Sequence, residues 1–454
     1  METLQGKRIA VIGLGPRTGV SLVRYLCTSG ANVIAYDRRS ESDLGESLRP
    51  LSGLRFDREF GTEDPRRIDG ADLVLVSPGV PSDTKFLSRL RSRGKSIWSE
   101  IEFASRRLRI PVIAVTGSNG KSTTTALIAH ILSHSGKRVF CGGNLGTPLI
   151  EAVDKPYDVA VAEISSFQLE AVETFHPRVG VLLNISPNHL DRHKDLRTYA
   201  GLKERLFDHM TSGNRAILNQ DDATCLEIAR RIHANVWFFS LRKNSDAQIR
   251  LQDGFISLPN GEKVSMRSYR LPGSHNLENA LAAAGAAASM DCPSSLIEKA
   301  ISTFEALPHR LQPVATIDQV RFINDSKSTT PDSAVRALES FPNPIVLLAG
   351  GRPKGASYAK LARAAQGKVR SAFFYGEAAE EMARAFSSVP HRVVKTLSEA
   401  LSAALSVAQS GDVVLLSPAN ASFDQFKDFE DRGRTFAALV KRSESTRKGV
   451  EADR

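Results

Sequence analysis

Short runs of apolar, mostly β-branched residues recur along the chain, and most of them end in glycine, asparagine, aspartate or serine. Runs of about four to eight such residues between turn formers are typical of buried strands. The expected strands are residues 9–12, 33–36, 73–76, 110–115, 158–163, 179–183, 320–323, 345–348, 372–375 and 413–416. Helical spacing lies between them, as in residues 20–26, 124–134 and 196–210. This alternation predicts an α/β fold with largely parallel sheets.

The order of these elements divides the 454 residues into three expected domains. Residues 1–99 start with strand, glycine turn and helix, which predicts a Rossmann-like N-terminal domain. Residues 100–306 place a glycine-rich loop between a strand and a helix, which predicts a central P-loop ATPase-type α/β domain. Residues 307–454 alternate strands and helices again and predict a C-terminal Rossmann-like α/β domain.

Composition limits the class of protein. Hydrophobic residues make up 41% and charged residues 24% of the chain, which is usual for globular domains. No apolar run is long enough to span a bilayer, and the first residues lead into a strand and not into a secretion signal. The four cysteines, Cys27, Cys141, Cys225 and Cys292, lie far apart. We therefore expect reduced thiols, no zinc site and a cytoplasmic protein without a membrane span.

The net charge of +10 comes from 60 basic and 50 acidic residues, with basic runs at residues 89–109 and 441–448. Such runs are usually solvated faces, and otherwise they attract polyanionic ligands. Aromatic residues are not interleaved with the basic ones, which argues against nucleic acid as a partner.

The strongest chemical signal follows the strand at residues 110–115. Glycines there let backbone N–H groups face one anion, and the start of the following helix adds its partial positive charge. Lys121 can reach the β- and γ-phosphates of a nucleotide, and the Ser122 hydroxyl can ligate Mg²⁺. The loop is shorter than the usual phosphate loop, and an ordinary glycine-rich turn is the alternative. Its residues are Gly117, Ser118, Asn119, Gly120, Lys121, Ser122 and Thr123.

Other strand ends also carry polar residues. A glycine turn near Gly15, with Asp37 about twenty residues further on, suits a dinucleotide, a diphosphate or a nucleotide sugar. Glu163 ends a strand where a P-loop protein places its Mg²⁺-linked carboxylate. His189 follows another strand end, and Lys203 lies four residues after Tyr199 on one helical face. Taken alone, Lys203 is interpreted as a surface lysine.

The third segment places three polar loops at the ends of its strands, residues 324–329, 350–355 and 417–424. Because the carboxyl ends of parallel strands meet at one edge, these loops predict a binding cleft. Before this segment, Asn276 and Asn279 could read a nucleobase edge, or Ser274 could simply cap the helix that contains them.

Taken together, these motifs resemble the Mur ligase family of ATP-dependent amide ligases that build peptidoglycan precursors. The resemblance covers the chain from Gly13 to about Phe436. Within the family, the chain most resembles ligases that add D-glutamate to UDP-N-acetylmuramoyl-L-alanine. The most specific motifs are residues 117–124, 188–192, 307–310, 324–329 and 416–427.

The resemblance implies roles for particular residues. The UDP substrate would be bound by Gly15, Thr18, Asp37, Arg38, Ser77, Gly79, Asn144 and His189. ATP would be bound by the phosphate loop together with Asn276, Arg310, Asp325 and Lys327. The incoming amino acid would be held by Thr329, Lys354, Ser422 and Phe429. Two Mg²⁺ ions would be ligated by Ser122, Glu163, His189 and Lys203, the last as a carbamate, and the catalytic residues would be Lys121, Glu163, His189 and Lys203.

Two departures from the family pattern affect these implications. The first glycine loop carries one extra residue within Pro16-Arg17-Thr18, next to the UDP contacts, and Asn420 stands where a cysteine is common. Glutamate is the expected amino acid, but D- and L-glutamate both stay open. Three competing hypotheses are a folylpolyglutamate synthase, a P-loop switch that only hydrolyses ATP, and a nucleic-acid-binding ATPase. We expect a monomer that acts on small-molecule substrates.

Overall fold

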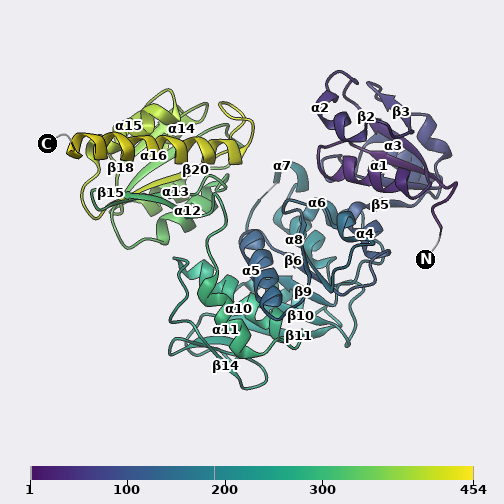
Figure 1. The fold of residues 1–454 in the computed structure, drawn as a ribbon, viewed down its shortest axis with the longest axis horizontal. Helices are drawn as coiled ribbons and strands as arrows, with labels where there is room; N and C mark the ends of the chain where they lie inside the picture. The colour runs from purple at the N-terminus through teal and green to yellow at the C-terminus, as the bar shows by residue number, and fades with distance from the viewer. Residues whose placement is uncertain (1–2, 189, 453–454) are drawn as a thin grey trace. The chain divides into compact units, whose positions relative to one another are not determined.

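The structure, a computed structural model, describes residues 3–188 and 190–452, and of residues 190–191 and 446–452 it describes the backbone alone (Figure 1). Its contacts divide the chain into two compact units. The N-terminal unit comprises Met1–Tyr269 and Glu278–Phe304, and the C-terminal unit comprises Arg270–Leu277 and Glu305–Arg454. The expected boundaries at residues 99/100 and 306/307 stay predictions. Three mostly parallel sheets confirm the predicted α/β fold class.

The first sheet has five parallel strands in the order β3-β2-β1-β4-β5. Its strands are β1 (Arg8–Ile12), β2 (Asn32–Asp37), β3 (Asp57–Phe60), β4 (Leu73–Val76) and β5 (Ile97–Ser99). The helical segments between and after them are α1 (Thr18–Thr28), α2 (Gly45–Leu48), η1 (Arg49–Leu51), η2 (Arg67–Gly70), α3 (Lys85–Ser92) and α4 (Glu100–Ser105). Ile12 pairs with Tyr36 and Val76, so the carboxyl ends of β1, β2 and β4 lie level at one edge.

The second sheet has nine strands in the order β14-β13-β12-β11-β10-β9-β6-β8-β7, and it belongs to the same unit. Its strands are β6 (Val112–Thr116), β7 (Val139–Gly143), β8 (Val159–Glu163), β9 (Val179–Leu182), β10 (Arg215–Asn219), β11 (Asn235–Ser240), β12 (Ile249–Gln252), β13 (Phe255–Ser257) and β14 (Lys263–Ser265). Strands β13 and β14 pair antiparallel, as a hairpin around Pro259-Asn260-Gly261. The central strand β6 is buried along its whole length.

The helical segments that follow β6 are α5 (Lys121–His134), η3 (Leu149–Ala152), α6 (Ser166–Leu169), α7 (Leu190–His193), α8 (Leu196–Glu204), α9 (Ala223–Ala229), α10 (Ser274–Ala288) and α11 (Ser294–Thr303). Two of them differ from expectation. The predicted start of α5 at residue 124 is wrong, because Gly120, with a φ of 84°, starts the helix at Lys121. The predicted end of α8 at residue 210 is also wrong, because the helix ends at Glu204. Beyond this end, Phe207 and Met210 pack closely against Gly180, where a Cβ would not fit.

The third sheet forms the core of the C-terminal unit, with the order β15-β16-β20-β17-β18-β19. Its strands are β15 (Gln312–Ile317), β16 (Val320–Asn324), β17 (Ile345–Gly350), β18 (Val369–Tyr375), β19 (His391–Val393) and β20 (Val413–Ala419). Its helices are α12 (Pro331–Glu339), α13 (Ala359–Ala365), α14 (Ala379–Ala385), α15 (Leu397–Val407) and α16 (Phe429–Ala452).

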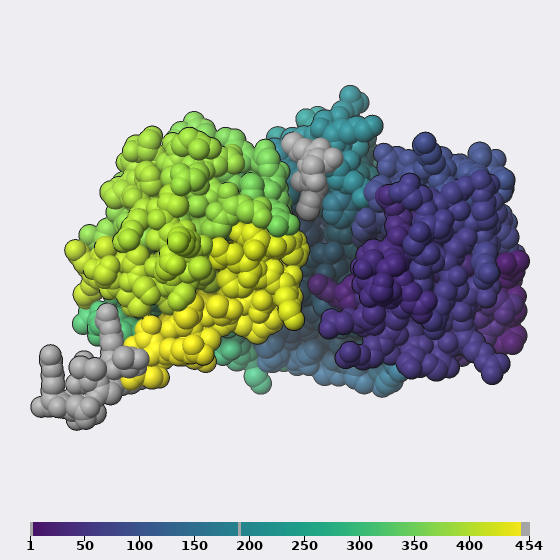
Figure 2. All heavy atoms as spheres, turned by 90° about the horizontal axis from the view of Figure 1, so that it is seen from above, coloured from purple at the N-terminus to yellow at the C-terminus, as the bar shows by residue number. Residues whose placement is uncertain are grey.

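Helices cover both faces of this third sheet. One apolar cluster joins it to α12, α13 and α14, and a second joins it to α15 and α16. The long helix α16, yellow in Figures 1 and 2, lies on the outside of the unit. Its own residues Phe436 and Val440 are buried against the sheet. The carboxyl ends of β16, β17 and β20, which are neighbours, carry the three polar loops that the sequence singled out.

Candidate active site

The phosphate loop requires both of its glycines. Gly117 and Gly120 have φ values of 146° and 84°, a region that other residues rarely adopt. A Cβ on Gly120 would lie 2.3 Å from Asn279 Oδ1, and a Cβ on Gly117 would lie 3.0 Å from Leu183 Cβ. The loop is therefore held against α10 and the end of β9, and no larger residue fits at Gly120.

Hydrogen bonds to the segment after β9 set the shape of this loop. The Ser118 and Asn119 N–H groups donate to Asn184 O at 2.8 Å and to Asn184 Oδ1 at 2.9 Å. Lys121 Nζ lies 2.9 Å from Gly117 O and 3.0 Å from Ser118 O, so its ammonium folds over its own loop. The Ser122 side chain is buried, as is Thr123, at the first turn of α5. Lys121 thus stands at the place where a bound phosphate would need a cation.

Lys203 is buried beside the strand that feeds this loop. Its side chain is 1% exposed, its Nζ lies 3.4 Å from Thr116 Oγ1, and it lies 4.7 Å from the centre of the Tyr199 ring. Burial, with the nearby charge of Lys121, lowers the pKa of Lys203 well below its ordinary value. The interpretation of Lys203 as a surface lysine is wrong, because helix α8 turns this face inward.

Glu163, also buried, lies at the carboxyl end of β8 and pairs in register with Val115. Its Oε1 accepts a hydrogen bond of 2.6 Å from Asn144 Nδ2. The structure therefore brings together two residues to which the resemblance gives different roles. A carboxylate and a serine hydroxyl near a phosphate loop are the oxygen donors that Mg²⁺ prefers, so Ser122 and Glu163 fit a magnesium ion.

Two further observations concern the expected metal ligands. His189 lies outside the described residues. Among the side chains that the structure describes, no group of three or more histidine, cysteine, aspartate or glutamate residues could hold a metal ion by itself. Mg²⁺ usually takes further oxygen ligands from bound phosphate and from water.

The expected UDP-binding residues Asp37 and Ser77 both contact the turn that follows β1. Asp37 Oδ2 accepts from the Leu14 N–H at 2.8 Å, and Ser77 Oγ donates to Gly13 O at 2.6 Å. Burial would raise the pKa of Asp37, but hydrogen bonds from Arg39 and Leu14 outweigh burial and lower it. Gly15 lies in the same turn, and Thr18 is the first residue of α1. Gly79 lies two residues after Ser77.

Arg39, which the sequence did not single out, is the arginine that contacts Asp37. Its Nε and Nη2 lie 3.0 Å and 2.8 Å from the two carboxylate oxygens. Arg38 instead pairs with Glu63, and both of these side chains are largely exposed. The sequence signal for Arg39 was only its place two residues after Asp37, which does not separate it from Arg38.

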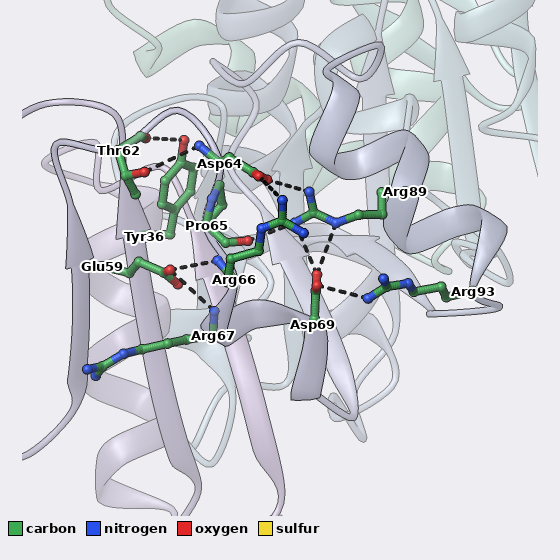
Figure 3. A network of polar contacts seen from close by, with 10 residues as sticks. All are labelled: Tyr36, Glu59, Thr62, Asp64, Pro65, Arg66, Arg67, Asp69, Arg89 and Arg93. Atoms are coloured by element: carbon green, nitrogen blue, oxygen red, sulfur yellow. Dashed lines mark hydrogen bonds and ion pairs between the residues drawn. The ribbon is translucent and has the colours of Figure 1, made fainter.

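A network of ion pairs fixes the loop that follows β3 (Figure 3). The Tyr36 hydroxyl donates to Thr62 O at 2.9 Å, and Arg89 on α3 pairs with Asp64 and Asp69. Arg93 adds a second contact to Asp69, at 2.8 Å. Part of the basic run at residues 89–109 is therefore neutralised within the first sheet's own loops, which supports its interpretation as an ordinary protein face.

The C-terminal unit contains the other expected ATP-binding residues. Asp325 is buried at the end of β16, where it accepts from Leu311 N at 3.2 Å and Ser417 Oγ at 2.9 Å. Burial raises the pKa of Asp325 to about 6, and hydrogen bonds and the charge of Arg310 oppose this rise. Lys327 Nζ lies 5.4 Å from the centre of the Phe429 ring. Asn276 Nδ2 donates to Pro272 O at 2.6 Å.

Two of the expected amino-acid-binding residues are in direct contact. Lys354 Nζ lies 3.3 Å from Thr329 Oγ1, which joins the loop after β17 to the loop after β16. Ser422 is buried after β20.

Arg432 on α16 was not predicted from the sequence. It is fully buried and donates from Nε to Ser326 Oγ at 2.9 Å and from Nη2 to Ser326 O at 2.9 Å. No local pattern distinguishes Arg432 from the exposed arginines around it.

The fold and the phosphate loop define an α/β protein of the P-loop class. Family models match most of the chain: the MurD-like N-terminal domain of Mur ligases over residues 7–99, the Mur ligase middle domain over residues 115–287, and the glutamate ligase domain of Mur ligases over residues 309–420. The chain belongs to the Mur ligase family.

Two relatives named UDP-N-acetylmuramoylalanine–D-glutamate ligase match nearly end to end. One, from Caldanaerobacter subterraneus subsp. tengcongensis, is 39% identical over 444 residues, and one from Geobacter metallireducens is 42% identical over 443 residues. Each match covers 96% of this chain and 98% of the relative. The solved structure of MurF from Acinetobacter baumannii has the same fold, with a TM-score of 0.63 at 18% identity over 97% of this chain and 92% of that one.

Proposed function

We propose that this protein is an ATP-dependent ligase that joins D-glutamate to UDP-N-acetylmuramoyl-L-alanine in peptidoglycan precursor synthesis, releasing ADP and phosphate. The observation that carries this proposal is the identity of 39% and 42% to ligases of that name over 96% of the chain. Matches that cover 96% of the chain extend over all three sheets. ATP and a nucleotide sugar as substrates imply a cytoplasmic enzyme, and we expect it to act as a monomer.

The chemistry needs ATP because a carboxylate is a poor electrophile. The carboxylate of the L-alanine residue would attack the γ-phosphorus of ATP in line, giving an acyl phosphate and ADP. The amine of glutamate would then attack the acyl carbon, lose its proton and expel phosphate through a tetrahedral intermediate. Negative charge grows on oxygen atoms in both steps, so fixed cations aimed at these atoms contribute most to the rate.

The phosphate loop supports the assignment of ATP. Gly117 to Thr123 would bind the phosphates, with Lys121 as the cation nearest the transferred group. Asn276, Arg310, Asp325 and Lys327 would bind other parts of the nucleotide. Ser122, Glu163, His189 and Lys203 would hold up to two Mg²⁺ ions, which when bound neutralise the triphosphate.

We propose that Lys203 is carbamylated. A lysine whose pKa is lowered by burial and by Lys121 is more often an unprotonated amine, which is the form that adds CO₂. The addition forms an N–C bond and releases the amine proton. It also replaces a buried amine beside the phosphate loop with a carboxylate-like group, which provides oxygen ligands for Mg²⁺.

The residues near Lys354 support glutamate as the amino acid. Lys354 supplies a positive charge, and the Thr329 and Ser422 hydroxyls supply hydrogen-bond donors. Phe429 would border the same pocket. An amino acid with two carboxylates satisfies these groups, whereas a neutral one leaves some unpaired, at roughly 1–3 kcal/mol each. A basic amino acid would be repelled by Lys354.

The test is phosphate release from ATP in the presence of UDP-N-acetylmuramoyl-L-alanine and one amino acid at a time. We expect release with D-glutamate and much less with L-glutamate, D-aspartate, L-alanine or meso-diaminopimelate. Preference for L-glutamate would revise only the handedness. Preference for a neutral or basic amino acid would overturn the assignment of the Lys354 pocket.

Omission of single components provides the controls. ATP hydrolysis without the nucleotide sugar would indicate a P-loop switch, and ligation of glutamate to a folate would indicate a folylpolyglutamate synthase. We expect neither activity, because the relatives match the first sheet as well as the other two.

A further inference from the structure

The side chain of Asn420 is anchored inside the C-terminal unit. Asn420 and Tyr358 are 1% and 3% exposed, and the Tyr358 hydroxyl donates to Asn420 Oδ1 at 2.6 Å. Burial raises the pKa of Tyr358 to about 12, so this hydroxyl keeps its proton and acts as the donor. Asn420 Nδ2 lies 3.2 Å from Pro418 O and 3.3 Å from Met382 Sδ. Both ends of the buried carboxamide therefore have partners, as a buried polar group requires.

The backbone around Asn420 joins three loops. The Ala419 N–H donates to Ser328 O at 2.9 Å, in the loop after β16. Ala421 exchanges two hydrogen bonds with Arg352, of 3.1 Å and 2.9 Å, in the loop after β17. Asn420 O accepts from Arg432 Nη1 and Nη2, each at 3.2 Å. Residues 419–421 thus contact both neighbouring loops and α16.

Each joined loop carries one residue of the expected amino-acid site. Thr329 follows Ser328, Lys354 lies two residues after Arg352, and Ser422 follows Ala421. The φ of Ala419 is 61°, a left-handed conformation that an alanine keeps only where its surroundings hold it. The buried side chain of the next residue, Asn420, is anchored by its hydrogen bonds and so helps to keep Ala419 in this conformation.

We propose that Asn420, held by Tyr358, is a positioning residue that sets the placement of Ser422 relative to Thr329 and Lys354, and through it the affinity for the amino-acid substrate. This inference rests on the proposed function, because it takes these three residues as the amino-acid site. Asn420 touches no substrate itself. It acts on amino-acid binding and leaves phosphoryl transfer to the phosphate loop of the other unit.

The first test is Tyr358→Phe, which removes one oxygen atom and keeps the ring. We expect the KM for D-glutamate to rise roughly three- to tenfold, with kcat and the KM values for ATP and the nucleotide sugar within about twofold of wild type. Asn420→Leu, close to isosteric, should raise the same KM further. The double variant should be no worse than Asn420→Leu, because the two groups form one interaction.

Val414→Ala is the matched control for lost stability. Val414 is buried in β20 and belongs to the apolar cluster on the other face of the same sheet. This variant should lower the melting temperature without changing the KM for D-glutamate. Equal changes in all three KM values, or an unchanged KM in both Asn420→Leu and Tyr358→Phe, would overturn the inference.

Hydrogen exchange gives a readout that does not depend on turnover. In Tyr358→Phe, the amides of Ala419 and Ala421 should exchange faster, while those of residues 413–416 in β20 stay unchanged. Unchanged exchange at Ala419 and Ala421 would contradict the positioning role. A wild-type protein without D-glutamate-dependent phosphate release would instead overturn the proposed function, and with it the assignment of the three residues.

Discussion

The amine nitrogen of Lys203 lies 3.4 Å from the hydroxyl oxygen of Thr116, the residue with which β6 ends. Thr116 in turn donates to Ile164 O at 2.9 Å, one residue beyond Glu163. The hydroxyl thus links the lysine to the ends of β6 and β8. A side chain in this position can act on groups bound at either strand end.

Lys203→Ala should lose nearly all ligase activity, because it removes the group that we expect to become a carbamate. Added acetate should restore part of the activity, since it can bring carboxylate oxygens into the space left by the side chain. Phosphate release measured across an acetate series checks this.

Lys155→Ala is the control, because Lys155 is exposed in the same unit. It should keep full activity and show no response to acetate. An active Lys203→Ala protein would remove the carbamate from the mechanism.

Lys121→Ala should lower kcat by more than about tenfold, equivalent to more than ~1.4 kcal/mol of transition-state stabilisation. The reason is that Lys121 is the cation of the phosphate loop and packs in no apolar core. Steady-state kinetics and a melting curve measure activity and folding separately.

Lys137→Ala provides the comparison, because Lys137 lies three residues after the end of α5, the helix that begins at Lys121. It should leave kcat within about twofold of wild type. If Lys121→Ala kept more than a tenth of the wild-type kcat, the loop would not be the site of phosphoryl transfer.

Gly120→Ala should abolish ATP-dependent turnover, because its Cβ would lie 2.3 Å from Asn279 Oδ1 and force the loop or α10 to move. Gly136→Ala is a matched substitution, since the φ values of Gly120 and Gly136 are 84° and 81° and nothing lies within 4 Å of a Cβ on Gly136. Both variants carry the backbone strain, roughly 1–2 kcal/mol. Only Gly120→Ala carries the clash, so only this variant should lose activity.

Glu100 and Glu102, two residues apart on α4, should change the pH dependence of the free energy of unfolding in opposite directions. Burial raises the pKa of Glu100 to about 7 from 4.5. The folded state therefore favours its neutral form, and its contribution to stability falls as pH rises from about 4.5 to about 7. Glu100→Gln keeps an acceptor for the Ile150 N–H and removes this fall, worth on the order of 3 kcal/mol. Urea unfolding at pH 5 and pH 8 should show the variant gaining stability relative to wild type at the higher pH.

Glu102→Gln is the opposite case. Burial would raise the pKa of Glu102, but the N–H groups of Glu173 and Thr174, the Thr174 hydroxyl and Arg106 outweigh burial and lower it. Its charged form stabilises the fold above its unfolded pKa, and this stability is lost as pH falls. Glu102→Gln should therefore be less stable than wild type at pH 8, with a smaller difference in acid. The same pH trend in both variants would contradict these opposite pKa shifts.

The phosphate loop could be predicted from sequence because its residue types lie in one short segment between a strand and a helix. Two glycines with the lysine and serine after them indicate the loop, but the start of α5 was predicted at residue 124 and lies at Lys121. Strands such as β4 and β8 were also predictable, since they are continuous apolar runs buried in parallel sheets. β3 was not, because Asp57–Phe60 is a short, polar edge strand that only its pairing with β2 defines.

The missed parts of the site depend on contacts between distant residues. The choice between Arg38 and Arg39 is made by the path of the chain after β2, which brings Arg39 back to Asp37. Arg432 and Asn420 acquire their roles only when α16 and the ends of β16 and β20 pack together. Asn279, for which the sequence suggested a contact with a nucleobase edge, lies against Gly120. No short window of sequence contains both partners of such contacts.

The contact of Asn279 with the phosphate loop also sets an order of events during synthesis. Asn279 Oδ1 accepts from Thr124 Oγ1 at 3.2 Å, although the two residues are 155 positions apart. A ribosome therefore produces the entire nucleotide-binding motif long before the residue that completes its packing. Until α10 has left the exit tunnel, the phosphate loop of the nascent chain lacks the helix against which it packs. A chain truncated before residue 279 would carry the complete motif and still lack the surface against which the loop takes its shape.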